Sequence, residues 1–106
     1  MKVVALVPDL MDRSRLSNAV PGVEFVTDPA VTADVATCVV IDLGRYGDAV
    51  AEIRRIAPAA RLVAFGAHVD DDALAAARRD GADLVLPRSR FFRDPVAAIT
   101  TVAQDE

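Results

Sequence analysis

The sequence predicts a doubly wound α/β domain, in which helices cover both faces of an open parallel β-sheet. Five short apolar runs recur along the 106 residues. Segments with helical spacing and helix-terminating residues separate most of these runs. Four of the runs do not alternate apolar with polar residues, which is typical of strands buried on both faces. This succession of strands and helices predicts parallel strands joined by right-handed crossovers.

The predicted strands follow the five apolar runs in order. They are VVALV (3–7), VEFV (23–26), CVVI (38–41), RLVAF (61–65) and ADLVL (82–86). Glu24 lies inside the second run, so this run is predicted to form an edge strand. The expected strand order is 2-1-3-4-5, the flavodoxin-like arrangement of doubly wound sheets.

The helices predicted at 10–20 and 70–81 are marked by their ends. A Pro-Gly pair terminates the first helix. The second opens with acidic residues and closes with two arginines, which complements the helix dipole. Gly81 stands where a left-handed cap is expected. Between the second and third strands, the segment 28–37 has room for little more than one helical turn, so the second helix is predicted to be short.

The helices predicted at 47–58 and 94–103 each carry one apolar stripe. Asp48 is expected to cap the first, and a proline ends it. Asp94 is expected to cap the second, with a proline at its first helical position. The residues expected to face the core are Val50, Ile53 and Ile56 or Ala57 in the first helix, and Val96, Ile99 and Val102 or Ala103 in the second.

Composition limits the classes of function. A chain of 106 residues suits one domain, spanning 1–106. The net charge of −4 argues against nucleic-acid binding, which needs a basic surface. There is no apolar run of the roughly 18 residues that a membrane span needs, and the N-terminus lacks the pattern of a secretory signal, so a cytoplasmic location without membrane contact is expected. The single cysteine, Cys38, lies in an apolar run and is expected to pack in the core.

Two aspartates are candidate site residues because of their positions at strand ends. Asp42 ends the third strand and Asp9 follows the first, so both flank the crevice where the strand order reverses and where ligands bind in such sheets. Other interpretations stay open. Asp9 and Asp12 also suit the N-terminal end of the first helix, and Asp42 followed by Gly44 also suits a strand-ending turn.

Three segments are similar to the receiver domains of bacterial response regulators, and the resemblance covers the whole chain. The segments are LVPDLMDRSRL, VVIDLG and ADLVLP, at the ends of the first, third and fifth strands. The resemblance implies a flavodoxin-like fold, a role in two-component signal transduction, and Mg²⁺-dependent phosphorylation of an aspartate. It places Asp9 at an acidic metal-binding position and Asp42 at the phosphoacceptor position.

The sequence departs from the family at three further positions. Pro8, Gly66 and Leu86 stand where the family has an acidic residue, a hydroxyl residue and a lysine. Lys2 is the only lysine and lies at the opposite end of the first strand. Phosphoryl transfer needs fixed positive charge, and the switch needs a hydroxyl that senses the phosphate. Standard phosphorylation is therefore not expected.

The metal site implied by the resemblance is impaired. Asp9, Asp12, Asp42 and the Gly44 carbonyl are the oxygen donors that remain for Mg²⁺, which prefers an octahedral oxygen shell and keeps several waters. At most weak Mg²⁺ binding is expected, and no other cofactor.

A small-anion site at the rim of the sheet is a separate hypothesis. His68 follows the fourth strand, and Arg88 and Arg90 follow the fifth, so their polar ends are expected to converge on one anion, with Asp42 as a base. No cysteine or second histidine completes a zinc site around His68.

The segment LPRSRFFRDP (86–95) is a candidate protein-contact site. Arg88, Arg90 and Arg93 surround Phe91 and Phe92, and one of the two rings is expected to be exposed beside the arginines, as in many binding hot spots. In the alternative interpretation, both rings close the core and the arginines are solvated.

The leading hypothesis is a stand-alone, degenerate receiver-like signalling domain that acts through protein contact and is not an enzyme. Its partner is another protein or a second copy of the chain, bound through the fourth helix, fifth strand and fifth helix. The alternatives are an atypical phosphoacceptor at Asp42 with weak Mg²⁺ binding, and a small-anion binding or catalytic site at the carboxyl rim.

Overall fold

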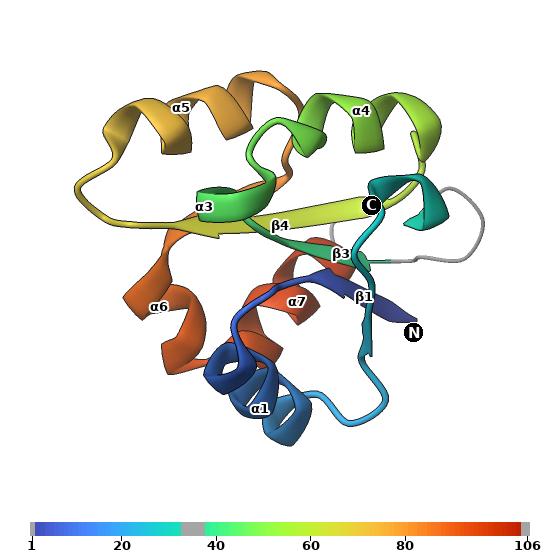
Figure 1. Ribbon diagram of the computed structural model, residues 1–106, viewed down its shortest axis with the longest axis vertical. Coiled ribbons are helices and arrows are strands. Elements are labelled where there is room, and N and C mark those ends of the chain that lie inside the picture. Colours follow the sequence, from blue (N-terminus) through green and yellow to red (C-terminus); the bar gives the residue numbers. More distant parts are fainter. Residues whose placement is uncertain (1, 33–37, 105–106) are drawn as a thin grey trace.

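The computed structural model describes residues 2–32 and 38–104 and contains one parallel five-stranded sheet (Figure 1). The strands are β1 (Val3–Leu6), β2 (Glu24–Phe25), β3 (Cys38–Asp42), β4 (Arg61–Gly66) and β5 (Leu84–Pro87). Their order is β2-β1-β3-β4-β5, and every neighbouring pair is parallel. The predicted fold class and strand order are confirmed, with the strand containing Glu24 at one edge.

Helices cover both faces of the sheet, as predicted. They are α1 (Leu10–Ala19), α3 (Leu43–Tyr46), α4 (Ala49–Ile56), α5 (Asp71–Arg79), α6 (Arg88–Arg93) and α7 (Pro95–Gln104), with a 3₁₀ turn, η1 (Pro29–Val31). In Figure 1, α3, α4 and α5 lie on one face, and α1, α6 and α7 lie on the other. The second predicted helix is represented by η1, and the remainder of its predicted segment, 33–37, lies outside the described residues.

Each face of the sheet has its own apolar core. On the face of α4 and α5, side chains such as Val39, Ile41 and Leu62 pack against the helices. On the face of α1 and α7, Val40 and Phe65 are among the corresponding residues. Consecutive residues of β3 therefore point into different cores, and both cores are apolar, which explains the absence of polar alternation.

Cys38 belongs to the core, as expected, with its side chain fully buried. Burial and, to a smaller extent, the nearby Asp83 raise the pKa of its thiol to about 12. The reactive thiolate is therefore scarce at neutral pH, and Cys38 acts as a small apolar side chain.

Several helix caps match the sequence prediction. Asp94 accepts a hydrogen bond from the Ala97 amide (3.0 Å), and Asp70 accepts one from the Ala73 amide (3.1 Å). Gly81 follows α5 with a φ of +116°, in the left-handed region that favours glycine.

Three details of the helices differ from the prediction. Asp48 precedes α4 but makes no capping hydrogen bond, because its backbone is already helical. Val96 is 47% exposed, whereas Ile99 and Val102 are buried, so the core-facing stripe of α7 begins one turn later than predicted. Ala103 lies in α7, and its side chain lies outside the described part of the structure. The segments after β3 and β5, for which no helix was predicted, form the short helices α3 and α6.

Arg54 joins three segments at the amino-terminal edge of the sheet. Its guanidinium donates hydrogen bonds to the carbonyls of Gly81, Pro58 and Ala60 and forms an ion pair with Asp83 (2.8 Å). The Asp83 carboxylate also accepts a hydrogen bond from the Leu62 amide (2.8 Å). This network fixes the start of β4 beside the start of β5, and so helps to set the register that positions residues at the opposite edge.

Across residues 2–32 and 38–104, none of the helices combines the length and the apolar character that crossing a bilayer requires.

Candidate functional site

Asp42 lies at the carboxyl edge of the sheet, at the crevice predicted from the strand order. It is the last residue of β3, and its half-buried side chain accepts a hydrogen bond from the Gly44 amide (2.9 Å). This bond caps the short helix α3. The strand-ending turn that was one interpretation of Asp42 is therefore present, and one carboxylate oxygen is used in it.

Two further aspartates lie near Asp42, at the N-terminal end of α1. Asp9 is exposed and caps α1 by accepting a hydrogen bond from the Asp12 amide (3.0 Å). Asp12, one turn further along, is only 2% exposed. Its Oδ1 accepts a hydrogen bond from Arg88, whereas the buried Oδ2 has no hydrogen-bond partner among the described residues.

Arg88 supplies the positive charge at this group of carboxylates. Its guanidinium forms an ion pair with Asp12, and its charge also acts on Asp42 and Asp9. The β4–β5 register pairs Gly66 with Pro87 at the carboxyl edge, and α6 begins at the next residue. This places Arg88 at the mouth of the crevice.

The Arg88 ion pair supplies a positive charge that the missing lysine does not. Leu86 stands at the family's lysine position, so no lysine is expected at the crevice. The cation instead comes from two positions further along the chain. The segment Leu-Pro-Arg already contained the signal, because a long arginine side chain directly after a strand reaches back to the strand ends.

Two ionisable groups at the crevice, Asp42 and Arg88, have perturbed pKa values. Burial raises the pKa of Asp42; the Gly44 hydrogen bond and the charge of Arg88 oppose this, and Asp12 and Asp9 add to it. The hydrogen bond to Asp12 raises the pKa of Arg88, with further support from the charges of Asp12, Asp42 and Asp9 against the effect of burial. Arg88 therefore stays charged whenever the protein is folded.

The position of the missing hydroxyl is enclosed by apolar side chains. Gly66 ends β4 and is buried. A Cβ atom at Gly66 would lie 3.4 Å from atoms of Leu43 and Leu74. The three heavy atoms nearest to this position are therefore apolar and at van der Waals distance.

The donor set fits Mg²⁺ poorly at Asp12, because a guanidinium is bound to its Oδ1. The described residues contain no group of three histidine, cysteine or acidic side chains arranged to hold a metal ion. Arg88 also competes electrostatically with a cation at this point. Weak Mg²⁺ binding by Asp9, Asp42 and the Gly44 carbonyl stays a prediction.

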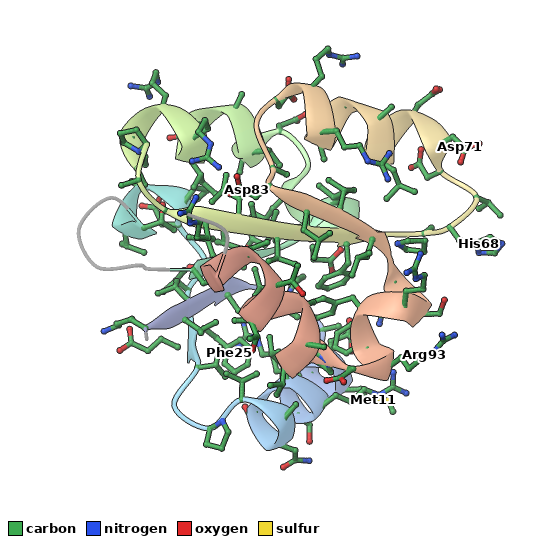
Figure 2. All side chains as sticks on the ribbon, turned by 180° about the vertical axis from the view of Figure 1, so that it is seen from behind. Met11, Phe25, His68, Asp71, Asp83 and Arg93 are labelled. Atoms are coloured by element: carbon green, nitrogen blue, oxygen red, sulfur yellow. The ribbon has the colours of Figure 1, made fainter. Side chains whose placement is uncertain are left out.

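The residues of the hypothetical rim site do not share one cavity among those described. His68 is exposed, and Figure 2 shows it at the outer edge of the loop after β4, pointing away from the body of the protein. Arg88 lines a cavity of about 370 Å³ between α1 and α6, and Arg90 lines a different one, of about 300 Å³, beside β5 and α7. Convergence of His68, Arg88 and Arg90 on one anion stays a prediction.

The two adjacent phenylalanines have unequal environments. Phe91 is fully buried and stacks on Phe65, with ring centroids 4.9 Å apart. Phe92 is partly buried and meets both rings edge-on, at 5.1 Å from Phe65 and 5.0 Å from Phe91. Phe91 therefore belongs to the core, and its predicted role as a contact residue is wrong, because no part of its ring reaches the surface.

Solved structures similar to this chain are receiver domains and related response-regulator proteins. A response regulator from Burkholderia pseudomallei, solved with a phosphorylated aspartic acid, a calcium ion and citrate, has 17% sequence identity and a TM-score of 0.77; the match covers 99% of this chain and 70% of that one. The BeF3-activated DrrB receiver domain has 15% identity and a TM-score of 0.78, with 95% of each chain covered. A CheY-like protein (tadZ) from Pseudomonas aeruginosa has 19% identity and a TM-score of 0.76, with 96% and 98% covered.

These similarities identify the fold. The chain has the fold of a response-regulator receiver domain, which confirms the structural part of the resemblance seen in the sequence. No protein-family model and no curated protein matches the sequence.

We expect Asp42→Asn to stabilise the protein at neutral pH. Because burial raises the pKa of Asp42 in the folded state, the ionised carboxylate costs stability above that pKa. The cost declines as the pH falls through the raised pKa and disappears below the ordinary value of 3.8. Asparagine retains the acceptor for the Gly44 amide. Urea unfolding of both proteins between pH 7 and pH 3 measures the difference, which should shrink as the pH falls.

Asp48→Asn is the matched control, because Asp48 is exposed and makes no capping bond. A stabilisation of the same size in this control, or an Asp42→Asn effect that grows towards low pH, contradicts the explanation based on burial of Asp42.

Proposed function

We propose that this chain is a signalling module of the receiver type that acts through protein contact, without phosphorylation of Asp42. One of the three carboxylates at the crevice, that of the buried Asp12, is already paired with the Arg88 guanidinium of the same chain. This ion pair is the observation that carries the proposal. It places a permanent positive charge from the chain itself next to the carboxylates, where phosphorylation would require a metal ion.

The environment of Gly66 supports a module without the phosphate-sensing switch. In such a switch, a side-chain hydroxyl moves towards the phosphate and changes the surface. Gly66 has no hydroxyl, and Leu43 and Leu74 flank the space beside it. Even if Asp42 were phosphorylated, no hydroxyl at position 66 could move towards the phosphate and change the surface.

A second candidate function is an atypical phosphoacceptor at Asp42, with weak Mg²⁺ binding. The observation in its favour is that the charge of Arg88 acts on Asp42, because a fixed cation is one requirement for stabilising a transferred phosphoryl group. In this alternative, Arg88 takes the part of the missing lysine.

The surface that we propose for contact is the face of α5, β5 and α7. A groove of about 300 Å³ lies at the β5 and α7 side of this face, beside α6. Leu84 and Leu86 are among its apolar lining residues, and Arg90, Arg93 and Asp94 are among its polar ones. Neither the Phe91 nor the Phe92 ring lines this groove. We therefore propose Leu84 and Leu86 as its apolar contact residues. Basic and acidic side chains on one face allow cross-pairing between two copies related by two-fold symmetry. We therefore propose a homodimer through this face.

Mg²⁺ and beryllofluoride, added to the wild-type chain, are expected to change neither its structure nor its association. The amide NMR shifts around Asp9, Asp42 and Gly66 should stay constant, because the positive charge of Arg88 already offsets the negative charge at the crevice. Light scattering across a concentration series should show self-association, and the curve should be the same with and without beryllofluoride.

Saturable shifts at millimolar Mg²⁺ that disappear in Asp42→Asn would favour the phosphoacceptor instead. For the contact face, Arg93→Glu should weaken association, whereas Arg55→Glu, an exposed arginine on α4, should not. A wild-type chain that stays monomeric at high concentration removes the homodimer from the proposal.

A further inference from the structure

A cavity between α1 and α6 gathers three arginines. It has a volume of about 370 Å³ and is lined by Arg15, Arg88, Ser89, Phe92 and Arg93. These residues come from two helices that are far apart in the sequence and lie on the same face of the sheet (Figure 1). The cavity is separate from the groove beside β5 and α7, although Arg93 contributes to both.

The lining of this cavity is positively charged within a protein of net charge −4. Arg88 is balanced by the buried carboxylate of Asp12. Among the described residues, neither Arg15 nor Arg93 forms a salt bridge. The cavity lining itself contains no acidic side chain. Two positive charges therefore remain without a counter-charge at this place, which favours a dianion.

Phe92 orients two of the guanidinium groups. The guanidinium carbon of Arg15 lies 5.8 Å from the centroid of the Phe92 ring, and that of Arg88 lies 5.3 Å from it. The ring is itself held edge-on against Phe65 and Phe91. Cation–π contact with a fixed ring reduces the freedom of long arginine side chains, so less order has to be gained when an anion binds.

The chemistry of these groups selects the ligand. Planar guanidinium groups donate paired hydrogen bonds to phosphate oxygens, and the Ser89 hydroxyl is a further donor. A phosphate group carries nearly two negative charges at neutral pH and several acceptor oxygens. We propose that the cavity between α1 and α6 is a binding site for a phosphate group, held by Arg15 and Arg93 with Arg88 and Ser89 beside them. This site does not involve Asp42. It shares Arg93 with the groove of the proposed contact face, so Arg15, which lines only this cavity, tests the phosphate site separately from the proposed function.

The test is a titration of the full chain with inorganic phosphate at constant ionic strength, followed by amide NMR shifts. The wild type should show saturable shifts in α1 and α6. Arg15→Gln should weaken phosphate binding by about tenfold, because the phosphate loses one charge-assisted hydrogen-bonding partner. Phe92→Leu should also weaken binding, because Arg15 loses the ring that orients it. Arg55→Gln, an exposed arginine on the opposite face, is the control and should bind as the wild type does.

Parallel titrations with glycerol phosphate and with a short phosphoserine peptide identify the source of the phosphate group. Tighter binding of the peptide assigns the site to a phosphorylated protein, and equal binding assigns it to small phosphorylated molecules. Thermal melts of each variant confirm that the fold is intact. Shifts that rise without saturation, or equal affinities for the wild type, Arg15→Gln and Arg93→Gln, overturn the proposal.

Discussion

Replacing Phe91 by alanine is expected to lower the free energy of unfolding by about 3–5 kcal/mol, the usual cost of removing a buried phenylalanine. The Phe91 side chain is fully buried and stacks on Phe65. Its loss leaves a cavity between α6 and the α1–α7 face of the sheet and removes an aromatic contact. Since small domains have about 5–15 kcal/mol of stability in total, the variant should be close to unfolding. Urea denaturation followed by circular dichroism measures the loss.

Phe92→Ala is the matched comparison, because the two residues are adjacent and chemically identical. Phe92 is only partly buried, so its replacement should cost clearly less stability than that of Phe91. It should also release the side chain of Arg15, which lies over the Phe92 ring. Equal losses in the two variants would mean that α6 is rotated relative to the arrangement in this structure.

Replacing Arg88 by methionine is expected to destabilise the protein by about 3 kcal/mol, because it leaves a buried carboxylate without its partner. Asp12 is 2% exposed, and its Oδ2 already lacks a hydrogen-bond partner among the described residues. The Arg88 side chain is 43% exposed, which places the expected loss at the lower end of the range for buried ion pairs. Methionine keeps a long unbranched apolar side chain beside Phe65 and Phe92, over whose rings the Arg88 guanidinium lies.

A double-mutant cycle separates the charge effect from packing. Combining Arg88→Met with Asp12→Leu removes both charges, so the double variant should be more stable than Arg88→Met alone. Arg55→Met is the control for removing an exposed arginine and should have an effect of about 0.5 kcal/mol or less. If Arg88→Met behaves like Arg55→Met, or if Asp12→Leu brings no recovery, the Arg88–Asp12 pair does not hold the crevice together.

Local sequence determined the strands, the longer helices and the position of Asp42 in this fold. Strands such as β3 and β4 are buried on both faces, so their apolar runs are continuous and can be recognised without knowing their neighbours. Helix ends are equally local, because the bonds from Asp94 to the Ala97 amide and from Asp70 to the Ala73 amide each span three residues. The position of Asp42 at the crevice could also be predicted, since it ends an apolar run and the carboxyl ends of parallel strands meet at one edge of the sheet.

Only the tertiary structure decided which charges meet and which aromatic ring is buried. Asp12 and Arg88 are separated by 76 positions in the sequence, and they meet because the β4–β5 register and the turn into α6 bring Arg88 back to α1. The identical neighbours Phe91 and Phe92 differ because they project from α6 about 100° apart, and only one direction leads into the core. Such contacts depend on how helices are rotated and placed against the sheet, and the order of residue types within one segment does not specify that placement.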